Sequence, residues 1–185
     1  IYLADITAHS HWKSKLNKAF QAMRTISRPQ GLYLWALDVQ RGTWEHLRQS
    51  QLFTHSQTFY YNLVRSYKQS GGADHEALDL YSEAIDAVER NQMFRRAKKS
   101  GLIYTSDYVI ENDFHEESMY ESGCPLGALL ALGAQAMQQR IDRKRANKTD
   151  SELIRINRHW TLARDLVETC HQVATSTKTK LLPQE

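Results

Sequence analysis

Apolar side chains recur every three or four positions in five stretches of the chain, and this spacing predicts five helices. The first helix would be capped by Ser10 and end before Pro29 and Gly31, because proline and glycine interrupt helices. The others are expected over about 56–69, from the cap Asp74 past Val88, over about 125–139 and over about 150–175. Successive helices are therefore expected to lie antiparallel to one another.

Two stretches change to the period of a strand. In "GLYLWALDVQRGTW", Leu32, Leu34 and Ala36 alternate with Tyr33, Trp35 and Leu37 before the turn 39–42, which predicts a β-hairpin. The stretch "GLIYTSDYVIEN" is also strand-like. An array of tetratricopeptide-like helix pairs fits poorly, because the spacing is irregular, no fixed period recurs and hairpins do not belong in it. The pattern instead favours a mainly α helical toroid with short β-hairpins at one end.

The pattern predicts a buried face for the helix after Asp74 and for the last helix, but not for the helix between them at about 125–139. The helix that follows Asp74 carries Leu78, Tyr81, Ile85 and Val88 on one face. The helix containing "LGALLALGA" is small and apolar all round. The expected buried face of the last helix consists of Leu153, Trp160, Ala163, Val167 and Cys170.

The composition narrows the class of protein. With 185 residues and 41% hydrophobic composition, the chain can bury one core, so one domain or part of one is expected. Its net charge is only +3, from 24 basic and 21 acidic residues. The basic clusters at 95–99 and 140–148 lie near predicted helix ends, where we expect them to be solvated and to complement the helix dipole. Neither has the pattern of a nucleic-acid-binding segment, so no nucleic-acid partner is predicted.

The chain also lacks a membrane or export signal. It has no run of 18 apolar residues, and its first residues, "IYLADIT", have neither a basic region nor a cleavage site. They resemble residues from the middle of a helix rather than from its start. We therefore expect the sequence to be an excerpt, with any targeting segment or membrane anchor upstream.

Five segments in a fixed order resemble motifs of the class I α-1,2-mannosidases, glycoside hydrolase family 47, which trim mannose from N-linked glycans in the endoplasmic reticulum and Golgi. "RPQGLYLWALDVQRGTW" resembles "GLYPNYLNP…TGKW", "QTFYYNLVRSYKQSGG" resembles "DSYYEYLLKQW", and "GLIYT" resembles "GGLTYI". "CPLGALLALGA" resembles "CFxGGMxALGA", and "LVETCHQVATSTKTKLLPQE" resembles "LxxTCYxxYxxxxxGLxPE". The likeness implies part of an (α/α)₇ barrel with hairpins lining one end.

The likeness runs over nearly all of the chain but covers well under half of the family's catalytic domain. We therefore expect residues 1–185 to form the middle portion of a mannosidase-like domain, with the N- and C-terminal parts missing. By count alone the two cysteines are uninformative. The resemblance places Cys124 and Cys170 on the family's two disulfide positions and so implies that they are bonded. Two buried free thiols in a cytosolic protein are the alternative.

The catalytic groups that the resemblance implies are altered. Inverting glycosidases use one carboxyl group to protonate the leaving oxygen and another to deprotonate the attacking water. The family's acid is a Glu that would precede residue 1. Its two candidate bases fall on Gln57, in a helix start with no acidic residue, and on Gln184. An amide hydrogen-bonds a sugar hydroxyl but cannot act as a base near neutral pH. Placing Glu185 at the second position would need an insertion that the spacing from Cys170 argues against.

Further positions depart from the family's motifs. Glu121 replaces the His of "HLxCF", Pro125 replaces its Phe, and Tyr61 replaces the Glu of "YEYLLK". We take His55, Phe59 and Glu121 as candidate glycan-binding residues, because imidazole and carboxylate bond hydroxyls and an aromatic face stacks on a pyranose ring. For at least two of the three consecutive aromatic residues of this helix, core packing is the alternative.

The remaining expectations concern ligands and location. Asn147 begins a glycosylation sequon in a polar inter-helix stretch, which supports a secretory route. No spacing suggests a metal cluster of His or Cys. The resemblance implies calcium, held by a Thr beyond residue 185, so no ligand for it lies within this chain. It also implies a high-mannose N-glycan or glycoprotein as partner, in the lumen of the endoplasmic reticulum or Golgi.

Three functions stay open at this point. The first is a pseudoenzyme that lacks its catalytic base and binds high-mannose glycans, or keeps only a structural role. The second is an active α-1,2-mannosidase in which another carboxylate substitutes. The third is a helical scaffold that binds protein partners. The two amides at the base positions favour the first.

Overall fold

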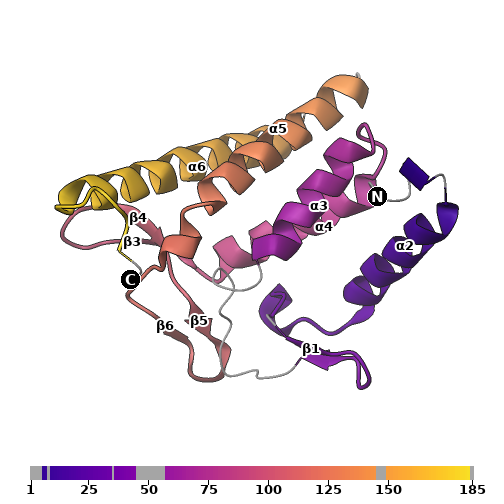
Figure 1. The fold of residues 1–185 in the computed structure, drawn as a ribbon, viewed down its shortest axis with the longest axis horizontal. Helices are drawn as coiled ribbons and strands as arrows, with labels where there is room; N and C mark the ends of the chain where they lie inside the picture. The colour runs from indigo at the N-terminus through magenta and orange to yellow at the C-terminus, as the bar shows by residue number, and fades with distance from the viewer. Residues whose placement is uncertain (1–5, 8, 35, 45–56, 145–148, 184–185) are drawn as a thin grey trace.

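The computed structural model describes residues 6–7, 9–34, 36–44, 57–144 and 149–183 as helices joined by turns and short hairpins (Figure 1). Its helices are α2 (Ser10–Thr25), α3 (Gln57–Gln69), α4 (His75–Arg90), α5 (Leu126–Lys144) and α6 (Asp150–Ser176). Single 3₁₀ turns cover Pro29–Gly31, Ile110–Asn112 and Glu121–Gly123. The five predicted helices are confirmed, with α5 extending further than predicted. The predicted Ser10 cap is wrong, because Ser10 is the first helical residue and His9 occupies the cap position.

The strands form three separate antiparallel pairs. They are β1 (Leu37–Asp38) with β2 (Thr43–Trp44), β3 (Phe94–Arg96) with β4 (Ile103–Thr105), and β5 (Tyr108–Val109) with β6 (Phe114–His115). The hairpin at the 39–42 turn is confirmed, but its strands are short. The predicted alternation before it is wrong, because Leu32, Tyr33 and Leu34 are all buried. The single strand-like stretch after residue 100 divides into β4 and β5, which belong to different sheets.

The helices form one array with the hairpins along one edge. Helix α6 packs along α5, and α5 in turn contacts both members of the α3–α4 pair. Figure 1 shows α5 and α6 side by side, α3 and α4 next to them, and α2 beyond, with the strands gathered below. This arrangement agrees with the predicted part of a helical barrel that carries hairpins at one end.

The small residues of α5 allow its neighbours to approach closely. A Cβ atom added to Gly133 would lie 2.1 Å from the hydroxyl oxygen of the fully buried Tyr81 on α4. At Gly127 an added Cβ would lie 2.8 Å from Val167 Cγ2 and 3.0 Å from the carbonyl oxygen of Ala163, both on α6. The glycines of "LGALLALGA" are therefore explained by close contact of α5 with α4 and α6.

Helix α4 is joined to its neighbours by ion pairs. Its carboxylates pair with arginines of α2, of the turn after α2, of α5 and of α6. The pairs are Glu76–Arg24 (3.1 Å), Glu83–Arg28 (3.6 Å), Asp79–Arg140, Asp86–Arg155 (2.8 Å) and Glu89–Arg158 (2.9 Å). Because most of these groups are partly exposed, each pair contributes at most about 1 kcal/mol.

The structure confirms the predicted cap of α4 but does not show both basic clusters as solvated helix ends. The predicted cap is confirmed, since the Asp74 carboxylate accepts a hydrogen bond from the Ala77 amide at 3.2 Å. The expectation of purely solvated basic clusters at helix ends is wrong in two places. Arg140 is paired within the array, and the guanidinium of Arg143 donates to the carbonyl of Gly71. Arg95 and the residue after it belong to β3 rather than to a helix end.

The buried face of α6 differs from the predicted one. Ala163 and Cys170 are buried, but Trp160 is 44% exposed and Val167 is 56% exposed. The buried residues of α6, which packs mainly on α5 and also contacts β4, are Ile156, His159, Leu162, Ala163, Leu166, Thr169 and Cys170. Because α6 carries apolar residues on two sides, its sequence alone does not determine which side the neighbouring elements cover.

One titratable side chain is enclosed between α4 and α6. His159 is fully buried, its Nδ1 lies 3.2 Å from the hydroxyl of Tyr81, and its Nε2 has no partner among the described residues. Burial, together with the nearby charges of Arg155 and Arg158, lowers the pKa of His159 to about 4. The imidazole is therefore neutral in the folded protein near pH 7.

This burial predicts a loss of stability in acid. Because the folded pKa of about 4 lies below the unfolded value near 6.5, the unfolded chain binds the proton more readily between these values. The free energy of unfolding should therefore fall as pH drops below about 6.5, by about 2 kcal/mol at pH 5, and level off below about pH 4. Denaturant titrations at several pH values measure this dependence.

A matched pair of variants isolates the contribution of the buried histidine. His159→Leu should flatten the decline in stability between pH 6.5 and 4, whereas His75→Leu, at an exposed position, should leave it in place. An unchanged pH profile in His159→Leu would show that other groups are responsible for the acid dependence.

Candidate functional site

The first candidate residue lies at the start of α3. Gln57 is the first residue of that helix, whose first turn holds no acidic side chain. The side chain is half-buried, and its Oε1 is shielded from solvent with no hydrogen-bond partner among the described residues. A buried carbonyl oxygen without a donor is unfavourable by about 1–3 kcal/mol, so the acceptor capacity of this atom is unused within the described residues.

One turn further along, Tyr61 connects α3 to the start of α5. Its hydroxyl donates to the carbonyl oxygen of Pro125, and burial raises the pKa of the phenol. Residues four apart lie on the same face of a helix, so Gln57 and Tyr61 share the side of α3 that meets this segment. The contact therefore brings the first turn of α3 close to the segment that precedes α5.

That segment carries Glu121 and the disulfide. Glu121 opens the 3₁₀ turn before α5 and is exposed. The bond between Cys124 and Cys170, with Cα atoms 6.0 Å apart, confirms the predicted pairing and fixes the start of α5 to α6. An added Cβ at Gly123 would lie 2.7 Å from Oγ1 of Thr105, so this segment lies directly against β4.

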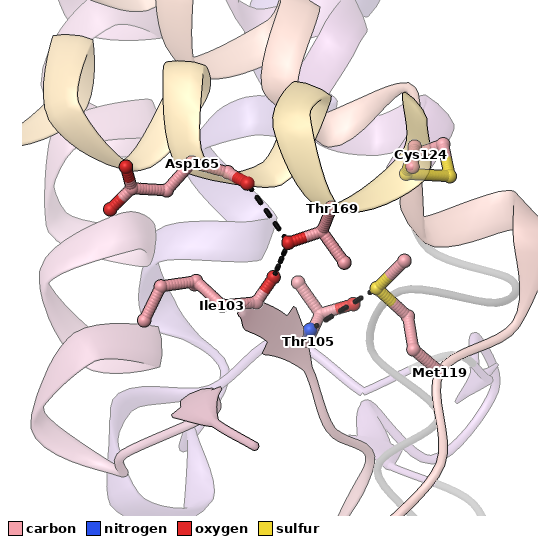
Figure 2. Close-up of a disulfide and its surroundings, with 7 residues drawn as sticks. Ile103, Thr105, Met119, Cys124, Asp165 and Thr169 are labelled. Carbon is pink, nitrogen blue, oxygen red and sulfur yellow. Dashed lines mark hydrogen bonds between the residues drawn. A yellow bond between two sulfur atoms is a disulfide. The ribbon is translucent and has the colours of Figure 1, made fainter. Parts of the chain in front are cut away.

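Hydrogen bonds fix the surroundings of the disulfide (Figure 2). The hydroxyl of Thr169, on the turn of α6 before Cys170, donates to the carbonyl of Ile103 at 2.5 Å and to that of Asp165 at 2.9 Å. The Thr105 amide lies 3.3 Å from the sulfur of Met119. The β3–β4 hairpin, the segment before α5 and the last turns of α6 therefore form one connected unit.

A groove of about 280 Å³ opens in this unit. Both cysteines line it, together with Leu102 and Tyr104 of the hairpin and residues 182–183 after α6. Its polar lining includes Glu117, Glu121, Ser100 and Thr169. The groove combines apolar and aromatic surface with two carboxylates that accept hydrogen bonds, so it offers contacts to a ligand with hydroxyl groups.

The structure brings together some of the residues predicted from the sequence for the site, but not all of them. It brings Gln57 and Glu121 to the same end of the helical array, through the contact of Tyr61 with Pro125. Phe59 is half-buried, with its ring 4.9 Å from that of Tyr33 and 5.6 Å from that of Tyr60, so its surroundings are those of a packing residue. Its contact with a glycan stays a prediction. His55, Asn147 and Gln184 lie outside the described residues.

Three features of the site were missed from the sequence. The sequence marks Tyr61 as a replacement for a Glu and as one of three consecutive aromatic residues, but nothing in its spacing indicates its bond to Pro125. Tyr104 and Glu117 were not selected either, because each is isolated in a segment without a motif. Only the fold brings them to the groove.

The described part of the chain contains neither a cluster of metal-binding side chains nor a helix that could cross a membrane. No group of three or more His, Cys, Asp and Glu side chains there is placed to hold a metal ion. The calcium that the resemblance implies therefore has no such cluster among the described residues. None of the described helices has the length and apolar character needed to cross a membrane.

An antiparallel helical array with hairpins and a groove at one edge defines the class of this protein as a partial helical-barrel domain. The family model of glycosyl hydrolase family 47 matches residues 1–185, and the chain belongs to this family. It is 29% identical over 183 residues to mannosyl-oligosaccharide alpha-1,2-mannosidase IA of Drosophila melanogaster, covering 99% of this chain and 25% of that protein. It is 27% identical over 184 residues to mannosyl-oligosaccharide 1,2-alpha-mannosidase IB of Homo sapiens, covering 100% of this chain and 26% of the relative. The chain thus spans about a quarter of the length of these relatives.

Proposed function

We propose that this chain is the glycan-binding part of an α-1,2-mannosidase-like protein that binds high-mannose N-glycans without hydrolysing them. The observation that carries the proposal is the amide at Gln57, one helical turn before Tyr61, whose hydroxyl donates to the Pro125 carbonyl ahead of α5. Its unpartnered Oε1 accepts a hydroxyl hydrogen bond, while its nitrogen carries no lone pair available for taking a proton from water. The second base position that the resemblance implies, Gln184, also holds an amide.

The relatives support the class of ligand. Those named above are described as acting on mannosyl oligosaccharides, and a further relative from Homo sapiens, 24% identical, is described as an endoplasmic reticulum enzyme. We accordingly propose a high-mannose glycan as partner and the lumen of the secretory pathway as location. The sequon at Asn147 agrees with that location.

Hydrolysis with a substitute carboxylate is the second candidate function, and one observation favours it. Glu121 is an exposed carboxylate on the groove, three residues before the disulfide. If Glu121 acts as the base, the complete polypeptide should release mannose, and Glu121→Gln should slow this release by about 10²–10⁴-fold.

One assay separates the two candidates. The complete polypeptide is incubated with a fluorescently labelled high-mannose oligosaccharide and calcium, and both retained glycan and released mannose are measured. We expect binding without release. Gln57→Ala should weaken binding by about 2- to 12-fold, the value of one hydrogen bond, whereas Gln69→Ala should not. Gln69 is the matched control because it is exposed at the other end of α3, about 18 Å away by helix rise.

Each other outcome counts against the proposal. Release of mannose by the wild type would establish an active enzyme. Absence of both binding and release would leave the third function, a scaffold for protein partners.

A further inference from the structure

A small polar cavity lies where the connection from β4 to β5 meets the segment that precedes α5. It is lined by Thr105 and Asp107 from the connection and by residues 118–120 and 122–123 from the segment. Thr105 is 3% exposed and Asp107 is 7% exposed, so both are shielded from bulk solvent. The two segments therefore meet through polar side chains in the interior.

Ser122 brings a hydroxyl without a partner to this cavity. Its Oγ is shielded from solvent, and no described residue forms a hydrogen bond with it. A buried hydroxyl that forms no hydrogen bond is unfavourable, and buried polar atoms of folded proteins are nearly always bonded to protein atoms or to ordered water. A hydrogen-bond partner for Ser122 is therefore expected inside the cavity.

The size and lining of the cavity select the kind of partner. Its volume is about 10 Å³, which is the space that the centre of one water molecule needs, whereas a sugar ring needs far more. A buried water also needs at least two polar partners, and Ser122, Thr105 and Asp107 supply them. Among the described lining residues Asp107 is the single carboxylate, which favours a neutral water over a metal cation.

We propose that one buried water joins Ser122 to the connection between β4 and β5, and that Ser122 is thereby a positioning residue for Glu121. The water accepts the hydrogen of the Ser122 hydroxyl and donates its own hydrogens to the side-chain oxygens of Thr105 and Asp107. The inference rests on the proposed function where it concerns the ligand, because Glu121 is a candidate glycan-binding residue.

Glu121 and Ser122 belong to one short turn but line different spaces. Glu121 lines the groove, whereas Ser122 lines the cavity. The backbone of this turn is bonded internally, since the Gly123 amide donates to the Tyr120 carbonyl at 2.9 Å. The Cys124 amide donates to the Glu121 carbonyl at 3.0 Å. Because the turn is held together in this way, a shift of Ser122 relative to β4 moves the Glu121 side chain with it.

High-resolution crystal structures of the complete polypeptide test the water directly. In the wild type we expect an ordered water about 2.5–3.0 Å from Ser122 Oγ. In Ser122→Ala this water should be lost and the carboxylate of Glu121 displaced from its wild-type position. The matched control is Ser82→Ala, which removes a buried hydroxyl that donates within α4 to the Leu78 carbonyl at 2.9 Å, and it should leave both features unchanged.

Titration with a labelled high-mannose oligosaccharide measures the consequence for binding. Ser122→Ala should weaken binding by about two- to fivefold, the value of part of one hydrogen bond, whereas Ser82→Ala should not. In a Glu121→Gln background, Ser122→Ala should cause no further loss, because the carboxylate that Ser122 positions is already absent. A merely structural role of Ser122 would lower the affinity equally in both backgrounds.

The outcomes separate this inference from the proposed function. A wild-type structure without an ordered water at Ser122 would overturn it, and so would a density peak about 2.4 Å from the surrounding oxygens, which would identify a metal cation. An unmoved Glu121 in Ser122→Ala, or equal losses of affinity in both backgrounds, would overturn the positioning role. If the complete polypeptide binds no glycan, the proposed function alone is removed, because the crystal structures still decide the water and the displacement of Glu121.

Discussion

Replacing Gln57 with Asp and Gln184 with Glu should create mannose release where the wild type shows none, at a rate at least about 10²-fold above its background. General-base catalysis typically contributes about 10²–10⁴-fold, and the two substitutions supply carboxylates at both base positions that the resemblance implies. Gln57 is already held at the start of α3, near the segment that precedes α5. Release of free mannose from a labelled high-mannose glycan by the complete polypeptide measures the gain.

The control replaces the side chain without supplying a base. Gln57→Asn in the Gln184→Met background has side chains similar in length to the test pair but no carboxylate, and it should stay inactive. Restored release in the test variant alone would identify the amides as the reason for inactivity. Unchanged glycan binding without release in the test variant would contradict this explanation, and would direct attention to Tyr61 and Pro125, whose hydrogen bond joins α3 to α5.

The sequence was most informative where local chemistry determines structure. Asp74 was predicted to cap α4 because its carboxylate satisfies a free amide of the first turn, and it accepts from Ala77. The end of α3 at Gly71 and Gly72 follows from their positive φ angles of 64° and 86°. The pairing of the two cysteines came from the resemblance rather than from any local rule.

The sequence was least informative where a residue has two equally suitable environments. Trp160 lies on the exposed side of α6 and His159 on the buried side, although hydrophobicity alone would order them the other way. His159 is accommodated because Tyr81 offers it a hydroxyl, a contact between residues 78 positions apart. The same limit applies to the groove, whose two carboxylates belong to no motif and meet Tyr104 only through the fold.

Removing the disulfide should produce the largest loss of stability of any single covalent change to this chain. Cys124 and Cys170 close a loop with a sequence separation of 46, for which the chain-entropy model gives about 4 kcal/mol. The bond also fixes the segment just before α5, where the Pro125 carbonyl accepts a hydrogen bond from Tyr61, so its loss should loosen the contact of α3 with this segment as well. Cys124→Ser/Cys170→Ser should lower the melting temperature by about 8–16 °C.

Two comparisons assign that loss to the crosslink. A reducing agent should lower the melting temperature of the wild type to that of the double serine variant and leave the variant unchanged. Ser122→Ala, two residues before Cys124, changes the same segment without touching the bond and should cost far less. If the variant instead melts within about 2 °C of the wild type, the packing of α6 along α5 alone holds this end of the array. The disulfide then does not position the candidate site.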